Sequence, residues 1–227
     1  MSIVLYDLVD KAGNRYSPYG WRIRMALLHK QLKCDVELCY HSDKKLEFTG
    51  QRLVPVLVDN GRAIPDSWNI ARYLDEKYPE RPLLLNDPQT RSFARFINIW
   101  TDTIVGRPLV RSMYLDIWRS LHPDADPVTF RKHREERNKA TLEELHARRE
   151  QDFHEVNRAL APLNTLLSEQ PYIAGEEPAY VDYIVFGTLQ MPRHLGGIEP
   201  LSPEHTALRK WRERIDRHHD SLVGRTA

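Results

Sequence analysis

The feature that most constrains the fold is a change of apolar pattern at residues 83–87. Before it, strand and helix periods alternate along the chain, and from Pro88 onward only the helical period remains. A chain of 227 residues is long enough for one large domain or two modest ones. The sequence therefore predicts an α/β unit over residues 1–82, followed by an all-α unit over residues 88–227.

The first unit opens with a strand, a helix and a second strand at short spacing. The predicted strands cover Ile3–Val9 and Cys34–Tyr40, and the helix between them ends near Lys30. Such a βαβ crossover is right-handed, so the two strands are expected to be parallel. Cys34 and Cys39 fall on opposite faces of the second strand, so we expect no disulfide between them. Reduced thiols favour a cytoplasmic location.

A predicted hairpin and a capped helix complete the first unit. Asn60-Gly61 is a strong hairpin signal, and it separates two short apolar runs. Pro55 lies near the start of the first run, where a missing N–H is tolerated at an edge, a strand start or a special turn. Asp66 is placed to cap the next helix. The inward stripe of that helix consists of Ile70, Ala71, Leu74 and Tyr78.

The second unit is predicted to consist of helices only. The first of them starts at Asp87-Pro88, and the later ones include a helix interrupted or kinked at Pro162 and a buried core helix around Asp182. Asp182 is placed to bond back to its own helix start, but Ala179 cannot supply the other half of a capping box. One face of the first long helix is marked by Phe93, Phe96, Ile97, Trp100 and Ile104, and a final helix by Leu208, Trp211 and Ile215.

Charge and composition indicate a small-molecule partner. The net charge is +1, from 33 basic and 32 acidic residues, so no strong field attracts nucleic acid or an anionic membrane. The charged segment over residues 119–151 interleaves both signs, which is typical of a solvated helical face. No apolar stretch has membrane-spanning length, and no export signal is recognisable. We therefore expect neither nucleic acid nor a membrane as partner.

The turn before the first helix is a candidate active site. It reads Tyr16-Ser17-Pro18-Tyr19-Gly20-Trp21. Ser is a favoured N-cap and Pro a favoured first helical residue. A helix N-terminus also offers N–H groups and a partial positive charge to an anion such as a thiolate. On these residues alone, the alternative that Ser17 only caps its helix stays open.

Together these motifs resemble the cytosolic glutathione S-transferase superfamily of the serine type. The resemblance rests on Ser17-Pro18-Tyr19, on the run from Leu53 to Asp59 before a hairpin, on Asp66-Ser67 at a helix start, and on the all-α second unit. A narrower resemblance is to the bacterial β-etherase and fungal etherase-related branch. It rests on Trp21, on the segments 65–71 and 73–79, and on Arg134-Glu135 followed by residues 141–144.

The resemblance implies a thioredoxin-like first domain and a role for each motif. Ser17 stands where a thioredoxin has the first cysteine of Cys-x-x-Cys, so dithiol chemistry is absent. Its hydroxyl is implied to donate a hydrogen bond to the glutathione sulfur. Val54 and Pro55 are implied to form a cis-proline turn that pairs with the cysteinyl backbone. Asp66 and Ser67 would hold the γ-glutamyl end, although Asp66 has an alternative role as a simple cap. Arg52 would either meet the glycyl carboxylate or be a surface arginine.

The electrophile site is implied to lie between the domains. Its candidates are Tyr16, Tyr19, Trp21, Met113, Tyr114 and Trp118, each of which has an alternative role in the core. The ten histidines show no metal-binding spacing, so no metal is expected. The resemblance implies a homodimeric glutathione transferase that acts on an electrophilic, aromatic substrate, including cleavage of a β-aryl ether. The alternative is a non-catalytic protein that binds apolar ligands on the same scaffold.

Overall fold

The first part of the protein is built on a mixed four-stranded sheet. The structure is a computed structural model that describes the backbone of residues 2–226 and the side chains of residues 2–220. The sheet has the order β2-β1-β3-β4. β1 (Ile3–Leu8) pairs in parallel with β2 (Asp35–Cys39) and antiparallel with β3 (Val56–Asp59), and β3 forms a hairpin with β4 (Arg62–Pro65). The predicted parallel pair and hairpin are both confirmed.

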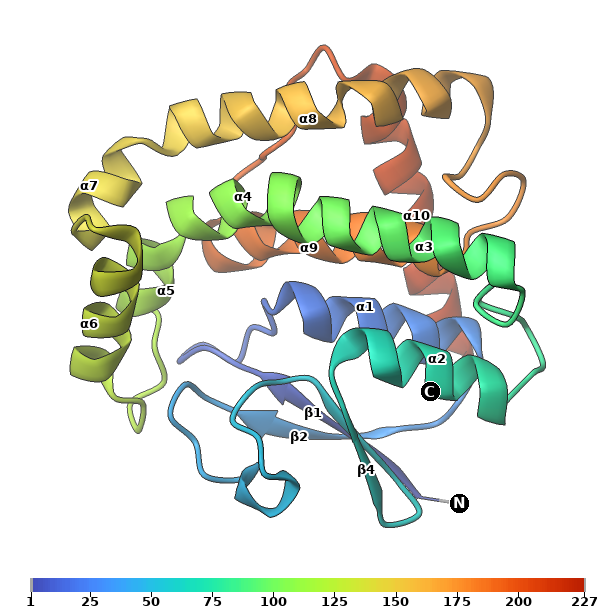
Figure 1. Ribbon diagram of the computed structural model, residues 1–227, viewed down its shortest axis with the longest axis horizontal. Helices are drawn as coiled ribbons and strands as arrows, with labels where there is room; N and C mark the ends of the chain where they lie inside the picture. Colours follow the sequence, from blue (N-terminus) through green and yellow to red (C-terminus); the bar gives the residue numbers. More distant parts are fainter. Residues whose placement is uncertain (1, 227) are drawn as a thin grey trace.

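Two helices cover the sheet on the side that faces the rest of the molecule (Figure 1). They are α1 (Pro18–His29) and α2 (Ser67–Lys77), which pack against each other, and a short 3-10 turn, η1 (Glu47–Thr49), precedes β3. The helices bury the apolar residues of their inner faces against β1 and β3. This unit is thioredoxin-like, as expected. Cys34 and Cys39 are both free.

The remainder of the described chain is helical. The long helix predicted from Pro88 is divided into α3 (Pro88–Trp100), a π-helical turn η2 (Thr101–Gly106) and α4 (Arg107–Ser112). The later helices are α5 (Tyr114–Arg119), α6 (Pro127–Asn138), α7 (Leu142–Ala147), α8 (Arg149–Glu169), α9 (Tyr180–Gly196) and α10 (Thr206–Thr226). The predicted fold class is confirmed, whereas the boundaries 1–82 and 88–227 stay a prediction. Pro162 lies inside α8 without interrupting it.

Helix α9 is the core of the helical part and packs directly on α1 (Figure 1). The approach is closest at Gly187, where an added Cβ would lie 2.7 Å from the carbonyl oxygen of Pro18. Asp182 accepts hydrogen bonds from the backbone N–H of Ala179 (3.0 Å) and Ile173 (2.8 Å) and from the indole of Trp211 (2.8 Å). The half of the capping box that the sequence predicts is therefore present. Burial raises the pKa of Asp182 to about 6.

Polar contacts join the sheet-bearing part to the helices. The guanidinium of Arg22 on α1 bonds to Asp102 in η2 (2.7 Å) and to the hydroxyl of Thr188 on α9 (3.0 Å). The hydroxyl of Tyr180 donates to the backbone carbonyl of Ser67 at the start of α2 (3.0 Å). Both first helices are thus fixed against α9, and the positions of their N-termini are set by the helical part.

One apolar row of α3 faces solvent. Phe93, Phe96 and Ile99 are 43%, 64% and 49% exposed, and Ile104 in η2 is 51% exposed, whereas Ile97 is buried. The predicted apolar face is therefore buried only in part. An exposed row of this kind is typical of a surface that another molecule covers.

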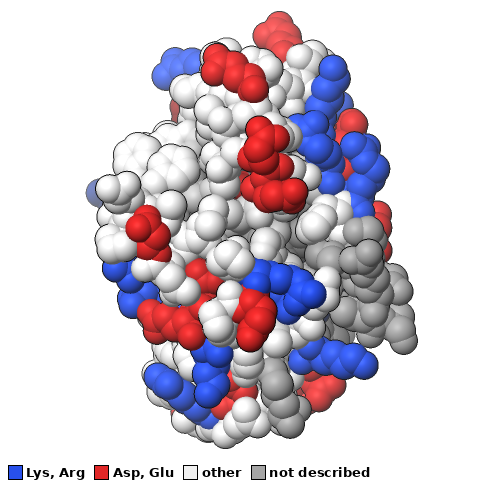
Figure 2. All heavy atoms as spheres, turned by 90° about the vertical axis from the view of Figure 1, so that its right-hand side faces the viewer, with Lys and Arg blue, Asp and Glu red and all other residues white. Residues whose placement is uncertain are grey.

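Charges of both signs are mixed on the surface. Figure 2 shows one face on which acidic and basic side chains lie next to one another. In the charged segment that precedes α8, Arg131 pairs with Glu135 and Glu143. A search of the described residues finds no helix that is both long and apolar enough to cross a membrane.

Candidate active site

Three predicted segments meet at one end of the sheet. Val56, the first residue of β3, is paired with Tyr6 near the end of β1 and with Pro65 at the end of β4. Val54-Pro55 and Asp66-Ser67 directly flank these paired residues. After β1 the chain turns back, since Arg15 bridges to Val9, and this return brings the start of α1 to the same end. The fold therefore brings together the segments that the resemblance assigns to one ligand.

Ser17 is the N-cap of α1. Its Oγ accepts a hydrogen bond from the backbone N–H of Gly20 (3.2 Å), and the residue is 4% exposed. Within the described part of the chain the hydroxyl donates to no acceptor, so its hydrogen is available to a ligand. Gly20 is required here, because an added Cβ would lie 1.9 Å from Oδ1 of Asp7. Burial raises the pKa of Asp7 to about 6, and Arg15 opposes this rise.

The Val54–Pro55 peptide bond is cis, as the resemblance implies. Val54 precedes β3, and its backbone N–H and C=O pair with no described residue. Val54 is partly buried and Pro55 is buried. A backbone donor and acceptor that are both unpaired next to a strand form a suitable edge for an extended peptide.

Asp66 and Ser67 begin α2. The carboxylate of Asp66 accepts from the backbone N–H of Asn69 (3.1 Å), so the capping role is real. Asp66 has a φ of +73°, a conformation that costs a non-glycine residue about 1–3 kcal/mol and often marks a functional site. Ser67 is 4% exposed, and its hydroxyl bonds to no described residue. A free hydroxyl at a helix N-terminus can bind a carboxylate.

Arg52 is exposed, and it forms no ion pair or side-chain hydrogen bond with a described residue. It lies two residues before Val54, on the loop that leads to β3. Its predicted contact with glutathione therefore stays a prediction.

Four of the six electrophile-site candidates gather in one cluster between the sheet-bearing part and the helices. Tyr16 and Met113 are buried there with Ile117, Phe130 and Met191, and Tyr114 and Trp118 pack against them. Burial raises the pKa of Tyr16 above its usual value, and Asp10 adds to the rise. One member of this cluster, Tyr16, directly precedes Ser17 in the sequence.

Trp21 and Tyr19 lie elsewhere. Trp21 is 6% exposed and belongs to the main core, where its ring stacks on His194 (4.8 Å between centroids) and meets Phe186 edge-on (6.2 Å). Trp21 is therefore not brought together with the cluster, because the helical period turns it toward α9 and α10. Tyr19 is 40% exposed, with the guanidinium of Arg22 over its ring (4.8 Å).

The structure adds His41, Phe130 and Arg134, which the sequence did not single out for this site. His41 follows β2, and its ring lies 4.9 Å from that of Phe130, centroid to centroid. Burial and the charge of Arg134 lower the pKa of His41 to about 4, so the imidazole is neutral at pH 7. Loop residues at strand ends often carry function, which is the one signal that could have pointed to His41.

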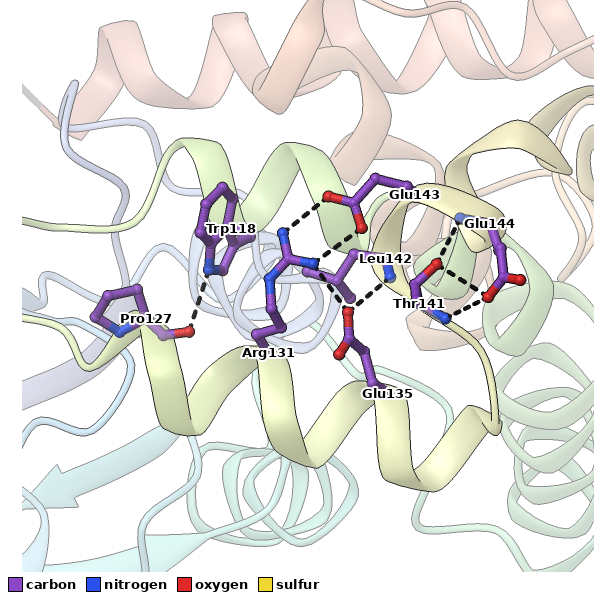
Figure 3. A network of polar contacts seen from close by, with 8 residues as sticks. All are labelled: Trp118, Pro127, Arg131, Glu135, Thr141, Leu142, Glu143 and Glu144. Atoms are coloured by element: carbon purple, nitrogen blue, oxygen red, sulfur yellow. Dashed lines mark hydrogen bonds and ion pairs between the residues drawn. The ribbon is translucent and has the colours of Figure 1, made fainter.

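Trp118 also faces outward. Its indole N–H donates to the carbonyl of Pro127 (3.1 Å), and the guanidinium of Arg131 lies over its ring (4.5 Å), as Figure 3 shows. With Val128, Lys132, Glu135 and Glu136, these residues line a surface groove of about 380 Å³. This groove contains no residue of the sheet end, so we do not assign it to the candidate active site.

No group of three or more His, Cys, Asp or Glu residues in the described part of the chain is placed to hold a metal ion. The polar groups of the site are instead hydroxyls, backbone amides and a helix N-terminus. Such a set suits a peptide-like ligand with carboxylates and a sulfur anion.

A thioredoxin-like unit followed by an all-helical unit, with free polar groups where they meet, defines a class of two-part enzymes and binding proteins. The chain belongs to the glutathione S-transferase family. Residues 13–82 match the profile of the glutathione S-transferase N-terminal domain, and residues 92–218 match that of the C-terminal domain.

Individual relatives agree with this assignment. The chain is 28% identical to glutathione S-transferase U22 of Arabidopsis thaliana over 176 residues, which cover 75% of this chain and 67% of the plant protein. A glutathione S-transferase of Ceriporiopsis subvermispora, solved in complex with glutathione, shares the fold with a TM-score of 0.82 at 22% identity over 98% of both chains. The β-etherase LigF of Sphingobium sp. strain SYK-6 has a TM-score of 0.71 at 20% identity over 99% of this chain and 100% of that one.

Proposed function

We propose that the protein is a serine-type glutathione transferase in which the hydroxyl of Ser17 holds the glutathione sulfur as a thiolate. The observation that carries the proposal is the unused donor of Ser17, a buried N-cap hydroxyl that accepts from Gly20 and donates to no described residue. A hydroxyl that accepts from a backbone N–H keeps its own hydrogen free to donate to a ligand. Ser17 acts here as a donor, not as a nucleophile.

The available interactions are strong enough for this role. A free thiol has a pKa of ~8.5, and lowering it by two units requires about 2.7 kcal/mol. A hydrogen bond to a charged acceptor contributes roughly 1.5–3 kcal/mol. The N-terminus of α1 adds up to ~2 kcal/mol in a partly buried geometry. No additional base is required.

We assign the other parts of glutathione to the remaining segments of the sheet end. The unpaired backbone N–H and C=O of Val54 bind the cysteinyl backbone, as an added strand would. The hydroxyl of Ser67 and the N-terminus of α2 hold the γ-glutamyl carboxylate, and Asp66 faces the amino group. Arg52 meets the glycyl carboxylate. Together these residues would bind all three parts of glutathione, which is the cosubstrate in this proposal.

The thiolate attacks an electrophilic carbon of an aromatic substrate bound against the cluster of Tyr16, Met113 and Phe130. A carbon–sulfur bond forms while the bond from that carbon to its leaving group breaks. For an aryl ether β to a carbonyl, the leaving group is an aryloxide, which departs with the bonding electron pair and takes a proton from solvent. The fold shared with a protein named as a β-etherase supports this substrate class.

The test is the Ser17→Ala variant, assayed with glutathione and chlorodinitrobenzene at about pH 6.5. The variant is expected to lose at least about one pKa unit of thiol activation, which lowers the thiolate fraction at this pH, and with it kcat/KM, at least about fivefold. Thr141→Ala is the matched control, since Thr141 caps α7 through the backbone N–H of Glu144 (3.2 Å). It loses a comparable cap, worth about 1 kcal/mol, and retains turnover. Full turnover of Ser17→Ala with an unchanged pH profile would refute the role of Ser17. Glutathione binding by the wild type without turnover on a broad panel would favour the non-catalytic alternative.

We also propose that the protein is a cytosolic homodimer joined through the exposed apolar row of α3 and η2. Phe96, which is 64% exposed, lies at the middle of this row. Sedimentation of Phe96→Glu is expected to give a monomer. Phe48→Glu, at a residue that is 61% exposed on η1, is the control that retains the dimer. A monomeric wild-type protein would contradict the proposal.

A further inference from the structure

Two arginines one turn apart on α6 have different environments. Both outer nitrogens of Arg131 bind the carboxylate of Glu143 (2.9 Å each), and one of them also binds Glu135 (2.9 Å), as Figure 3 shows. The side chain of Arg134 forms no ion pair and no hydrogen bond with any residue that the structure describes. The positive charge of Arg134 is therefore not compensated within the described part of the chain.

The guanidinium of Arg134 is held by aromatic rings instead. Its central carbon lies 4.1 Å from the ring centroid of Phe130 and 5.9 Å from that of Tyr114. The side chain is partly buried, and this burial lowers its pKa. Its unpaired nitrogens are not among the fully buried polar atoms, so solvent or a ligand can reach them. The rings fix the orientation of a cation whose donors are free.

The same rings connect Arg134 to the reacting end of the site. Phe130 belongs to the same buried cluster as Tyr16, which directly precedes Ser17. His41 lies against Phe130 and has a buried Nε2 without a partner in the described structure. The nearby carboxylate of Asp10 is already bound by Ala12 and Asn14. This side of the cluster thus offers a cation and a neutral imidazole, and no described carboxylate forms an ion pair with Arg134.

We infer that Arg134 is a specificity-determining residue that selects aromatic electrophiles carrying a carboxylate. The guanidinium binds the carboxylate through two parallel N–H donors, and the aromatic ring of the substrate lies along Tyr16 and Phe130 toward the sulfur. A free guanidinium fork fits a planar carboxylate better than it fits a neutral acceptor. This inference rests on the proposed function, because it concerns the second substrate of the same site.

The test compares two glutathione conjugates that differ in a single group. S-benzylglutathione and S-(para-carboxybenzyl)glutathione share all contacts of the tripeptide, and only the second reaches Arg134 with a carboxylate. Calorimetric titration of the full chain is expected to give a Kd about tenfold lower for the carboxylated conjugate, the effect of one charge-assisted contact. Arg134→Ala removes this preference and leaves the affinity for S-benzylglutathione within about twofold.

Two further variants separate specific recognition from general charge. Lys132→Ala removes one positive charge from a side chain on α6 that is 68% exposed, and it retains the tenfold preference. Arg134→Lys keeps the charge without the planar fork, and it retains only part of the preference. Equal affinity of the wild type for both conjugates, or the same preference in Arg134→Ala, overturns the inference while the proposed function stands. Failure of both conjugates to bind contradicts the proposed function and this inference with it.

Discussion

The two sides of the candidate site are built in different ways. The sheet side offers the hydroxyls of Ser17 and Ser67 and the backbone N–H and C=O of Val54. A local turn or helix start leaves each of these groups unpaired. On the helical side, rings from α5, α6 and two loops form a cluster of side chains around Tyr16. The sheet side depends on backbone geometry and suits one fixed ligand. We expect substitutions on the helical side to change the second substrate without disturbing the sheet side.

The largest expected effect comes from the contact that joins the two sides. In Gly187→Ala, the new Cβ meets the carbonyl oxygen of Pro18 at 2.7 Å, and backbone cannot move aside as a side chain does. We expect the free energy of unfolding to fall by about 3 kcal/mol, even after the gain in helix propensity. Urea denaturation measures this change.

Gly196→Ala is the matched control on the same helix. Its new Cβ meets only the flexible end of Ile198, at 3.1 Å, so we expect a loss below about 1 kcal/mol. Equal stability of Gly187→Ala and the wild type would contradict the close contact between α9 and α1.

The sheet-bearing part and the helical part of the chain each hold a buried carboxyl, which links stability to pH. The pKa values of Asp7 and Asp182 are raised to about 6 by burial, so between about pH 4 and 6 the folded state holds protons that the unfolded state has lost. Their contribution to stability therefore falls as the pH rises. His29 and His41, with pKa values lowered to about 4 by burial, act in the opposite direction over the same range.

Burial also lowers the pKa values of His194 and His219, which add to the rise of stability with pH in the wild type. Asp7→Asn removes one contribution to stability that falls as the pH rises. Between about pH 4 and 6, the free energy of unfolding of the variant therefore rises by about 2 kcal/mol more than that of the wild type. Denaturation at a series of pH values measures the two profiles. Parallel profiles would show that the pKa of Asp7 is not raised.

The smallest expected effect concerns glutathione affinity. Asp66→Ala removes the carboxylate that we place near the amino group of glutathione, and we expect the KM for glutathione to rise about fivefold with kcat little changed. Asp87→Ala is the control, because Asp87 also caps a helix and accepts from Gln89 and Thr90. It should lose about 1 kcal/mol of stability and keep its KM. An unchanged KM in Asp66→Ala would leave Asp66 as a cap alone.

The contrast between a sheet side built from local turns and caps and a helical side built from distant segments explains what the sequence could predict. Asn60-Gly61, the cap at Ser17 and the cap at Asp66 are local signals, and the structure contains each of the elements that they predict. Met113 and Tyr114 could be proposed from their position in the family pattern, but Trp21 belongs to the main core instead.

The long-range part of the site could not be predicted. Arg134 and His41 are more than ninety residues apart, and they meet only because α6 folds over the loop after β2. Periodicity likewise predicts an apolar helix face that includes Phe93 and Phe96, but it does not indicate that these side chains stay exposed. Such contacts depend on the path of the whole chain, which no local pattern encodes.

The most direct test of the account is the thiol pKa of glutathione bound to the protein, measured by the ultraviolet absorbance of the thiolate. In the wild type we expect a pKa about two units below the free value of ~8.5. In Ser17→Ala, with glutathione still bound, we expect at least about one unit of this shift to be lost. An equal thiol pKa in both proteins would contradict the central claim that Ser17 stabilises the thiolate.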